Sequence, residues 1–127
     1  ALKPDTWFTL QRTWRDGDTV RIDFPYSLSF APVDRANEEI VALTYGPVAL
    51  ASDEMTLLIG DREHPEEWIK PVPDVFATFN TLPGHASKQA FITRTFRPYY
   101  RIGPMEWYFM YCRIYPDAAS VPRKPWL

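Results

Sequence analysis

IVALTYGPVALA, the stretch from Ile40 to Ala51, is the part of the sequence that decides the fold class. It is almost continuously apolar and rich in β-branched residues, which is typical of a strand covered on both faces. The pair Gly46-Pro47 divides it into two short pieces, as expected where a buried strand bends or bulges midway. A helix is the competing interpretation, but a central proline would break it. The stretch therefore predicts β-structure.

A β-hairpin is predicted on the N-terminal side. TVRIDF (residues 19–24) has the clearest period-two alternation in the chain, and WFTLQRTW (residues 7–14) alternates weakly but is rich in aromatic residues and threonine. Between them, Gly17 can take a positive φ and Asp16 can accept hydrogen bonds from nearby backbone amides, which indicates a turn. YSLSF (residues 26–30) alternates again and predicts a further strand.

The C-terminal side predicts further short strands. Four runs favour them: MTLLI (residues 55–59), VFATFNT (75–81), QAFITRTF (89–96) and WYFMYCRIY (107–115). Pro65 followed by two glutamates resembles a first helical turn, so we expect at most one short helical turn near residues 65–69. The tail, residues 116–127, contains three prolines and should be extended.

Composition supports the same fold class. The 127 residues are 46% hydrophobic and 16% aromatic, with 13 prolines against 5 glycines, which favours short strands joined by rigid turns. We therefore predict an all-β, antiparallel, jelly-roll-like β-sandwich over residues 1–115, followed by the proline-rich tail.

Several classes of partner and site are not favoured. A net charge of −2 gives no footprint for nucleic acid, and no apolar run approaches the roughly 20 residues that span a bilayer. Cys112 is the only cysteine, so an intramolecular disulfide and a multi-cysteine zinc site are both excluded. Because the first residue is Ala1 rather than Met, we expect the chain to begin away from the natural N-terminus.

Three motifs in order resemble one family of proteins. They are Trp7-x-Thr9-Leu10-x-Arg12-x-Trp14-x-x-Gly17-Asp18-x-Val20, then Val41-Ala42-Leu43-x-Tyr45-Gly46-Pro47-Val48, and finally Phe96-x-Pro98-Tyr99-Tyr100-Arg101-Ile102 with Tyr108-x-Met110-Tyr111. Their order and spacing are similar to the β-L-arabinofuranosidase-like enzymes of glycoside hydrolase family 127. The motifs frame most of the chain, although residues 53–89 contribute nothing to the resemblance.

The resemblance implies an accessory role. Enzymes of that family follow a helical catalytic barrel with β-sandwich domains, and the barrel holds zinc through a glutamate and a cysteine cluster, with one cysteine as the nucleophile. This sequence has no matching cluster, so the resemblance implies a fragment with no catalytic residue, metal or cofactor of its own. It also implies a catalytic domain of the same polypeptide as partner, a plant-type polysaccharide as a further partner, and a secreted or periplasmic setting.

Candidate catalytic residues each have a simpler interpretation. Cys112 lies in an apolar strand and is expected to be an inert core residue. His64 and His85 lie on predicted loops without metal-ligand spacing and are expected to be exposed. Adjacent acidic pairs such as Glu38-Glu39 point to opposite faces of a strand, so they do not build the facing carboxylates of a glycosidase.

The aromatic cluster near the C-terminus leaves two functions open. In the first, its side chains form the sandwich core and the seam to a catalytic barrel, because both faces of residues 107–115 are apolar. In the second, Tyr99, Tyr100, Trp107 and Tyr108 bind carbohydrate by stacking on sugar rings. We favour the structural role. Apolar surface left exposed without the barrel would favour a homo-oligomer.

Overall fold

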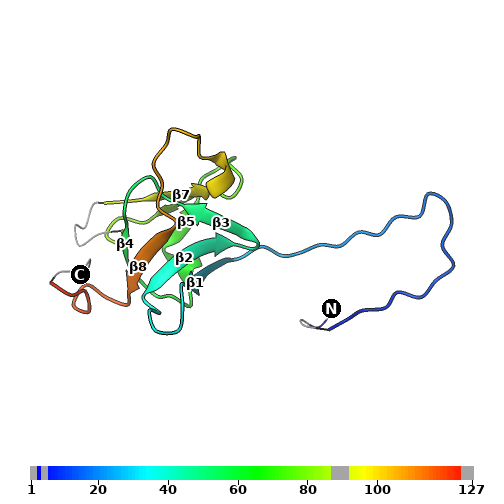
Figure 1. Cartoon of the computed structure of the whole chain (residues 1–127), viewed down its shortest axis with the longest axis horizontal. Helices are drawn as coiled ribbons and strands as arrows, with labels where there is room; N and C mark the ends of the chain where they lie inside the picture. Colours follow the sequence, from blue (N-terminus) through cyan, green and yellow to red (C-terminus); the bar gives the residue numbers. More distant parts are fainter. Residues whose placement is uncertain (1–2, 4–5, 87–91, 124–127) are drawn as a thin grey trace.

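The computed structural model describes residue 3, residues 6–86 and residues 92–123. These residues form eight strands and two short 3-10 helices (Figure 1). The strands are β1 (Leu28–Pro32), β2 (Ile40–Tyr45), β3 (Val48–Ala51), β4 (Leu57–Ile59), β5 (Ile69–Pro71), β6 (Phe79–Thr81), β7 (Thr95–Pro98) and β8 (Tyr111–Tyr115), and the helices are η1 (Pro65–Glu67) and η2 (Tyr99–Arg101).

The strands form one bent sheet that makes a sandwich-like body. Its order is β4-β8-β2-β3-β7-β6-β5, and β1 also pairs with β2. Because β3 pairs with both β2 and β7, it joins a layer of β1, β2, β4 and β8 to a layer of β5, β6 and β7. The predicted all-β sandwich-like class is confirmed.

Two details differ from the predicted antiparallel sandwich. The pair β4–β8 is parallel, whereas the other six pairs are antiparallel. The chain between these two strands builds the second layer, so it returns to the first layer in the direction in which it left. A helical turn forms at η1, within the predicted residues 65–69, but a second one, η2, also forms, whereas the sequence predicted at most one.

Gly46-Pro47 makes a turn rather than a bend within one strand. Tyr45 pairs with Val48 and Thr44 with Ala49, so β2 and β3 are the two arms of an antiparallel hairpin. Gly46 has a φ of +55°, and a Cβ at this position would lie 2.8 Å from the ring of Tyr26. Glycine is therefore needed both for the turn and for the close approach of that ring.

The core lies between the two layers. Alternation along β2 points Val41 and Leu43 inward, and both are fully buried. They pack with apolar side chains from both layers, namely Leu50, Leu58, Ile69, Phe79, Phe96, Cys112 and Ile114. Each large side chain buried in this way contributes roughly 1.5–3 kcal/mol.

A stack of three rings fixes the two layers against each other. Trp68 lies 5.9 Å from Phe30 of β1 and 5.2 Å from His85, with both ring pairs nearly parallel. The indole N–H of Trp68 donates to the carbonyl of Asp61 at 2.8 Å, which satisfies its only polar atom. A Cβ on Gly60 would lie 2.5 Å from the Trp68 ring, so the backbone passes directly against it.

The predicted N-terminal hairpin is wrong. Residues 6–25, which we call the N-terminal arm, contain no strand and leave the sandwich as an extended chain that doubles back (Figure 1). The predicted turn does form: the amide of Asp18 donates to the carbonyl of Arg15 at 3.1 Å, and Gly17 has a φ of +87°. Strand pairing on either side of the turn is what the arm lacks.

The other predicted strands form, but most are shorter. Residues 55–59 contain β4, and residues 26–30 overlap β1. The run at residues 75–81 keeps only β6, because Asp74 and Ala77 have positive φ values that build turns before it. Part of the run at residues 89–96 lies outside the described residues, and β7 forms at its end.

The C-terminal tail lies beyond the last strand. Residues 116–123 carry no strand or helix, as the prolines predict, but Val121 is buried. Residues 124–127 of the predicted tail lie outside the described residues. No helix in the described part of the chain is long and apolar enough to cross a membrane.

Candidate binding surface

A loop between β7 and β8 carries the aromatic residues singled out in the sequence. We call residues 99–109 the aromatic loop. At its start, buried Pro98 ends β7 and η2 follows; at its end, Phe109 and Ser52 exchange two backbone hydrogen bonds of 2.8 and 3.1 Å. In the middle, the Glu106 carboxylate accepts hydrogen bonds from Arg97 at 2.7 Å and from the Gly103 amide at 3.2 Å. The loop is therefore held in shape by the body.

The anchored loop presents large apolar side chains to water. Met105 is 92% exposed and Trp107 is 87% exposed, and the two line a shallow cavity of about 300 Å³ with Pro104 and Glu106. Tyr99 and Tyr100 are both about half exposed and meet edge to face, with ring centroids 6.0 Å apart. Large apolar side chains exposed on one anchored loop make the loop a candidate binding surface.

All four predicted site residues lie on this loop. Tyr99 and Tyr100 belong to η2 and contact each other, whereas Trp107 and Tyr108 come later in the loop, after η2 has ended at Arg101. The expectation that the cluster belongs to the sandwich core is wrong for these four, because Tyr108 is also about half exposed. Alternation predicted core positions from residue 107 onward, but β8 begins only at Tyr111.

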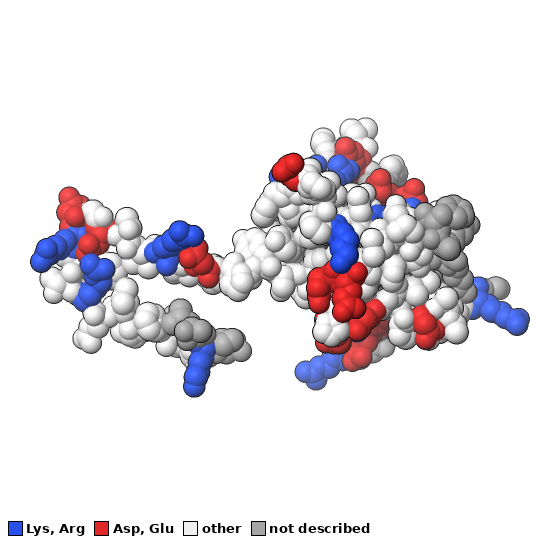
Figure 2. Space-filling view, turned by 180° about the vertical axis from the view of Figure 1, so that it is seen from behind, with Lys and Arg blue, Asp and Glu red and all other residues white. Residues whose placement is uncertain are grey.

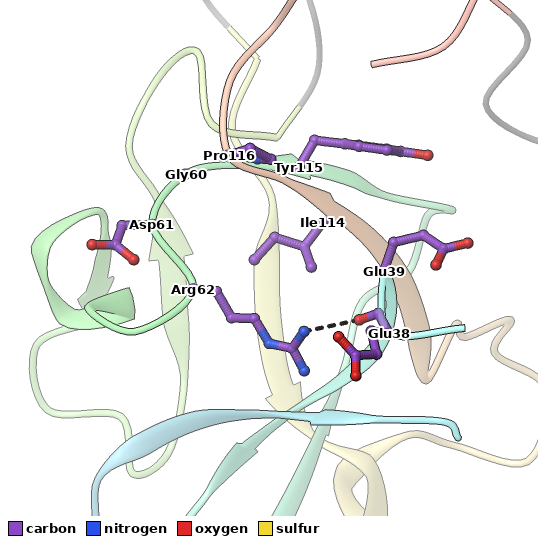
Figure 3. A pocket seen from close by; sticks show the side chains of 8 residues that line it. All are labelled: Glu38, Glu39, Gly60, Asp61, Arg62, Ile114, Tyr115 and Pro116. Atoms are coloured by element: carbon purple, nitrogen blue, oxygen red, sulfur yellow. Dashed lines mark hydrogen bonds between the residues drawn. The ribbon is translucent and has the colours of Figure 1, made fainter. Parts of the chain in front are cut away.

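A second concavity, of about 410 Å³, lies where β2 begins and β4 and β8 end (Figure 3). Its lining combines an apolar part with charged groups: Glu38, Glu39, Gly60, Asp61, Arg62, Ile114, Tyr115 and Pro116. Arg62 reaches across it and donates to the backbone carbonyl of Glu38 at 3.0 Å. Sequence reasoning missed this concavity because its lining comes from three separate segments.

Two carboxylates around this concavity, those of Glu39 and Asp61, accept hydrogen bonds from the protein. Glu39 pairs with Arg113 of β8 at 3.0 Å, and its backbone carbonyl accepts from the Ile114 amide at 2.9 Å. Glu38 and Glu39 lie in the turn before β2, so strand alternation does not apply to them; only the Glu39 carboxylate is paired with an arginine of the described chain, and the two glutamates do not act as a facing carboxylate pair.

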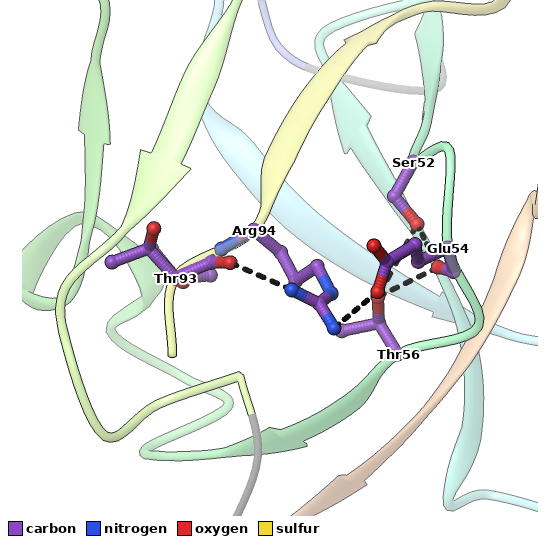
Figure 4. A network of polar contacts seen from close by, with 6 residues as sticks. Ser52, Glu54, Thr56, Thr93 and Arg94 are labelled. Atoms are coloured by element: carbon purple, nitrogen blue, oxygen red, sulfur yellow. Dashed lines mark hydrogen bonds and ion pairs between the residues drawn. The ribbon is translucent and has the colours of Figure 1, made fainter. Parts of the chain in front are cut away.

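A polar network joins the β3–β4 connection to the start of β7 (Figure 4). The hydroxyls of Ser52 and Thr56 both donate to the carbonyl of Glu54, at 2.6 and 2.9 Å. The Glu54 carboxylate pairs with Arg94, whose Nη1 also donates to the carbonyl of Thr93 at 3.0 Å. Ser52 and Thr56 are buried, so these bonds satisfy groups that would otherwise destabilise the fold.

Cys112 is not built as a nucleophile. Its side chain is buried and lies 3.5 Å from the carbonyl of Val41, to which the thiol donates. Burial raises the pKa of the Cys112 thiol to about 12. Nucleophilic cysteines need a depressed pKa, so this thiol behaves as the core residue that the sequence predicts.

The two histidines occupy different environments. His64 is exposed, as predicted, and its Nδ1 lies 3.4 Å from the carboxylate of Glu66. His85 is partly buried, contrary to expectation, because it stacks on Trp68 and its Nδ1 donates to the carbonyl of Ile59 at 2.7 Å. These contacts give His85 a structural role.

The described residues contain no group of three histidine, cysteine, aspartate or glutamate side chains that could hold a metal ion. On the face shown in Figure 2, basic and acidic side chains lie side by side along the arm.

Comparisons with protein-family models, with curated proteins and with solved structures found no match to the chain. Fold and surface thus define the class: an all-β sandwich-like body with an exposed arm and an anchored aromatic loop.

Proposed function

We propose that this chain is a non-catalytic accessory domain of a glycoside hydrolase that packs, through its aromatic loop, against a separate catalytic barrel. The observation that carries the proposal is the exposure of Trp107 and Met105 on a loop whose ends and middle are fixed by hydrogen bonds. Aromatic side chains and methionine are enriched at protein interfaces, and a preformed loop loses little conformational entropy on docking.

The glycoside hydrolase setting is supported by the three ordered sequence motifs. Two of them have clear structural roles in this fold. Tyr45-Gly46-Pro47-Val48 forms the β2–β3 turn, and Pro98-Tyr99-Tyr100-Arg101 carries the end of β7 into η2. The remaining motif, which runs from Trp7 to Val20, contains the Arg15–Asp18 turn of the arm.

A non-catalytic role is supported by what the candidate groups do. The Cys112 thiol has a raised pKa, and Glu39 is engaged by Arg113. We expect the chain alone not to hydrolyse an aryl arabinofuranoside. Hydrolysis that disappears in a Glu38→Gln or Asp61→Asn variant would overturn this half of the proposal.

Docking can be measured directly. The chain should bind the isolated catalytic barrel of a β-L-arabinofuranosidase-like enzyme in a calorimetric titration, and Trp107→Ala should weaken binding by roughly 30-fold, as for a central interface residue. Val33→Ala, which trims another exposed apolar side chain, is the matched control. Absence of binding, or equal affinity of the two variants, would contradict the proposal.

Carbohydrate binding by the same loop is the second candidate function. It is favoured by the exposed rings of Tyr99, Tyr100 and Trp107, since sugar rings stack on such faces. Affinity electrophoresis in gels containing arabinan, pectin or arabinogalactan distinguishes the two. Retardation that is lost in the Trp107→Ala variant would support sugar binding, and unchanged mobility in all three gels would exclude it.

A further inference from the structure

The N-terminal arm carries the clearest strand pattern in the chain and yet forms no strand. Val20, Ile22 and Phe24 are apolar and more than half exposed, while Arg21 and Asp23 alternate with them. Such alternation is typical of a strand with one buried face and one face in water. The arm therefore has the properties of a segment that pairs with something outside its own body.

Pairing within the arm is disfavoured by register. The turn from Arg15 to Asp18, closed by a 3.1 Å hydrogen bond, would set Trp14 opposite Thr19 and continue outward from there. Arg12 would then face Arg21, and Leu10 would face Asp23. The apolar face of Val20, Ile22 and Phe24 would lie beside Thr13, Gln11 and Thr9. Two like charges opposite each other destabilise a strand pair, and so does a face that mixes apolar with polar side chains.

Pairing of the same segment with a second copy has the opposite character. In an antiparallel ladder centred on Ile22, each Ile22 faces the other, and Val20 faces Phe24. Arg21 of each copy then faces Asp23 of the other, which places two opposite-charge pairs on the solvent face. Within one chain, Arg21 and Asp23 form an exposed ion pair of 2.9 Å, so their side chains lie on the same face of the extended segment.

We propose that the chain forms a two-fold symmetric dimer in which residues 19–24 of two copies pair as antiparallel strands. The contact is isologous, as in most homodimers. Two strands alone are marginally stable, so the six apolar side chains on one face need a cover. The WFTLQRTW run supplies it, because Phe8, Leu10 and Trp14 share one face and are exposed.

The area available approaches that of a small specific interface. On the faces that would meet, each arm exposes three aromatic rings, those of Phe8, Trp14 and Phe24, and the aliphatic side chains of Leu10, Val20 and Ile22. At roughly 150 Å² for a buried ring, the six rings of two arms remove at most about 900 Å² from water, and the aliphatic side chains add to this area, toward the roughly 1,200 Å² of a small specific interface.

A charge-exchange series tests the pairing. Sedimentation equilibrium of the whole chain should show a dimer, and Arg21→Asp or Asp23→Arg should each raise its dissociation constant by roughly tenfold, because like charges then face each other twice. The double variant, in which the pairs are reversed, should restore the affinity. Arg35→Asp and Glu67→Arg make the same charge changes on exposed sites of the body and should have no effect. The proposal would be overturned if the chain were a monomer at all concentrations, or if the single variants dimerised as tightly as the native chain.

Cysteine crosslinking tests the register independently of affinity. Ile22→Cys should form a disulfide-linked dimer under mild oxidation, since directly opposed Cβ atoms lie within disulfide range. Val20→Cys should not, because its copy lies four residues away along the ladder, roughly 13 Å. Buried Cys112 does not compete. Equal crosslinking of both variants would mean random contact and would contradict the two-fold register.

Discussion

Gly60 illustrates how one missing Cβ holds the core together. Its backbone passes against the Trp68 ring, which is itself fixed between Phe30 and His85 and cannot move aside. We expect Gly60→Ala to lower the free energy of unfolding by about 1–3 kcal/mol, the usual cost of overpacking. Gly103→Ala is the control, because its nearest contact would be an ordinary 3.7 Å. Equal midpoints of the two variants in denaturant unfolding would contradict this reading of the Trp68 stack.

Cys112 predicts a specific pH dependence. Burial raises the pKa of its thiol from 9.0 to about 12, so the unfolded chain releases the proton first. Between these values the unfolded state binds fewer protons, and the free energy of unfolding should fall by about 1.4 kcal/mol per pH unit. The contribution is fully present below pH 9, the unfolded-state value, and is lost on the alkaline side.

Cys112→Ala isolates that contribution from other groups that titrate in alkali. The variant should be less stable at neutral pH, through a small cavity, but its stability should fall less steeply above pH 9. Denaturant unfolding of both proteins at a series of pH values gives the two slopes. Parallel slopes would show that the thiol is accessible to water.

The N-terminal arm should be dispensable for the fold. The packed body begins at Tyr26, the residue after the arm, whose ring meets Tyr45 edge to face at 5.3 Å and lies over Gly46. A chain lacking residues 1–25 should keep its β-sheet circular dichroism, and its unfolding free energy should change by no more than about 0.5 kcal/mol. Loss of the cooperative unfolding transition on truncation would show that the arm is part of the body.

Local sequence pattern predicted strands correctly where the body supplies a neighbouring strand that pairs with them. The β-structure of β2 and β3 follows from their β-branched composition, although Gly46-Pro47 makes a hairpin turn between them rather than the predicted bend, and η1 follows from Pro65 and its glutamates. The N-terminal hairpin failed because a turn and alternating apolar residues do not ensure a matched register. Opposing positions in the arm, such as Arg12 and Arg21, carried the contrary signal in the sequence itself.

Contacts between distant segments were beyond the sequence. The stack of Phe30, Trp68 and His85 joins three segments, and the concavity at Arg62 joins three others. No local period encodes such meetings, since they depend on how the two layers of the sandwich close. The aromatic loop was predicted as a candidate site, but its exposure follows from where β8 begins, a boundary that alternation placed four residues too early.

The whole molecule thus combines a packed body with two surfaces that lie outside its core, and hydrogen exchange can separate them. Amides of β2 and β8 should exchange slowest, because these central strands are paired with neighbours and surround buried Val41 and Cys112. In dilute solution the arm should exchange at unprotected rates. At high concentration residues 19–24 should gain protection as the dimer forms, while the amides of the aromatic loop should not change. Protection of the arm that is independent of concentration would instead indicate that it packs on its own body, and mass spectrometry of peptides from the two conditions distinguishes these outcomes.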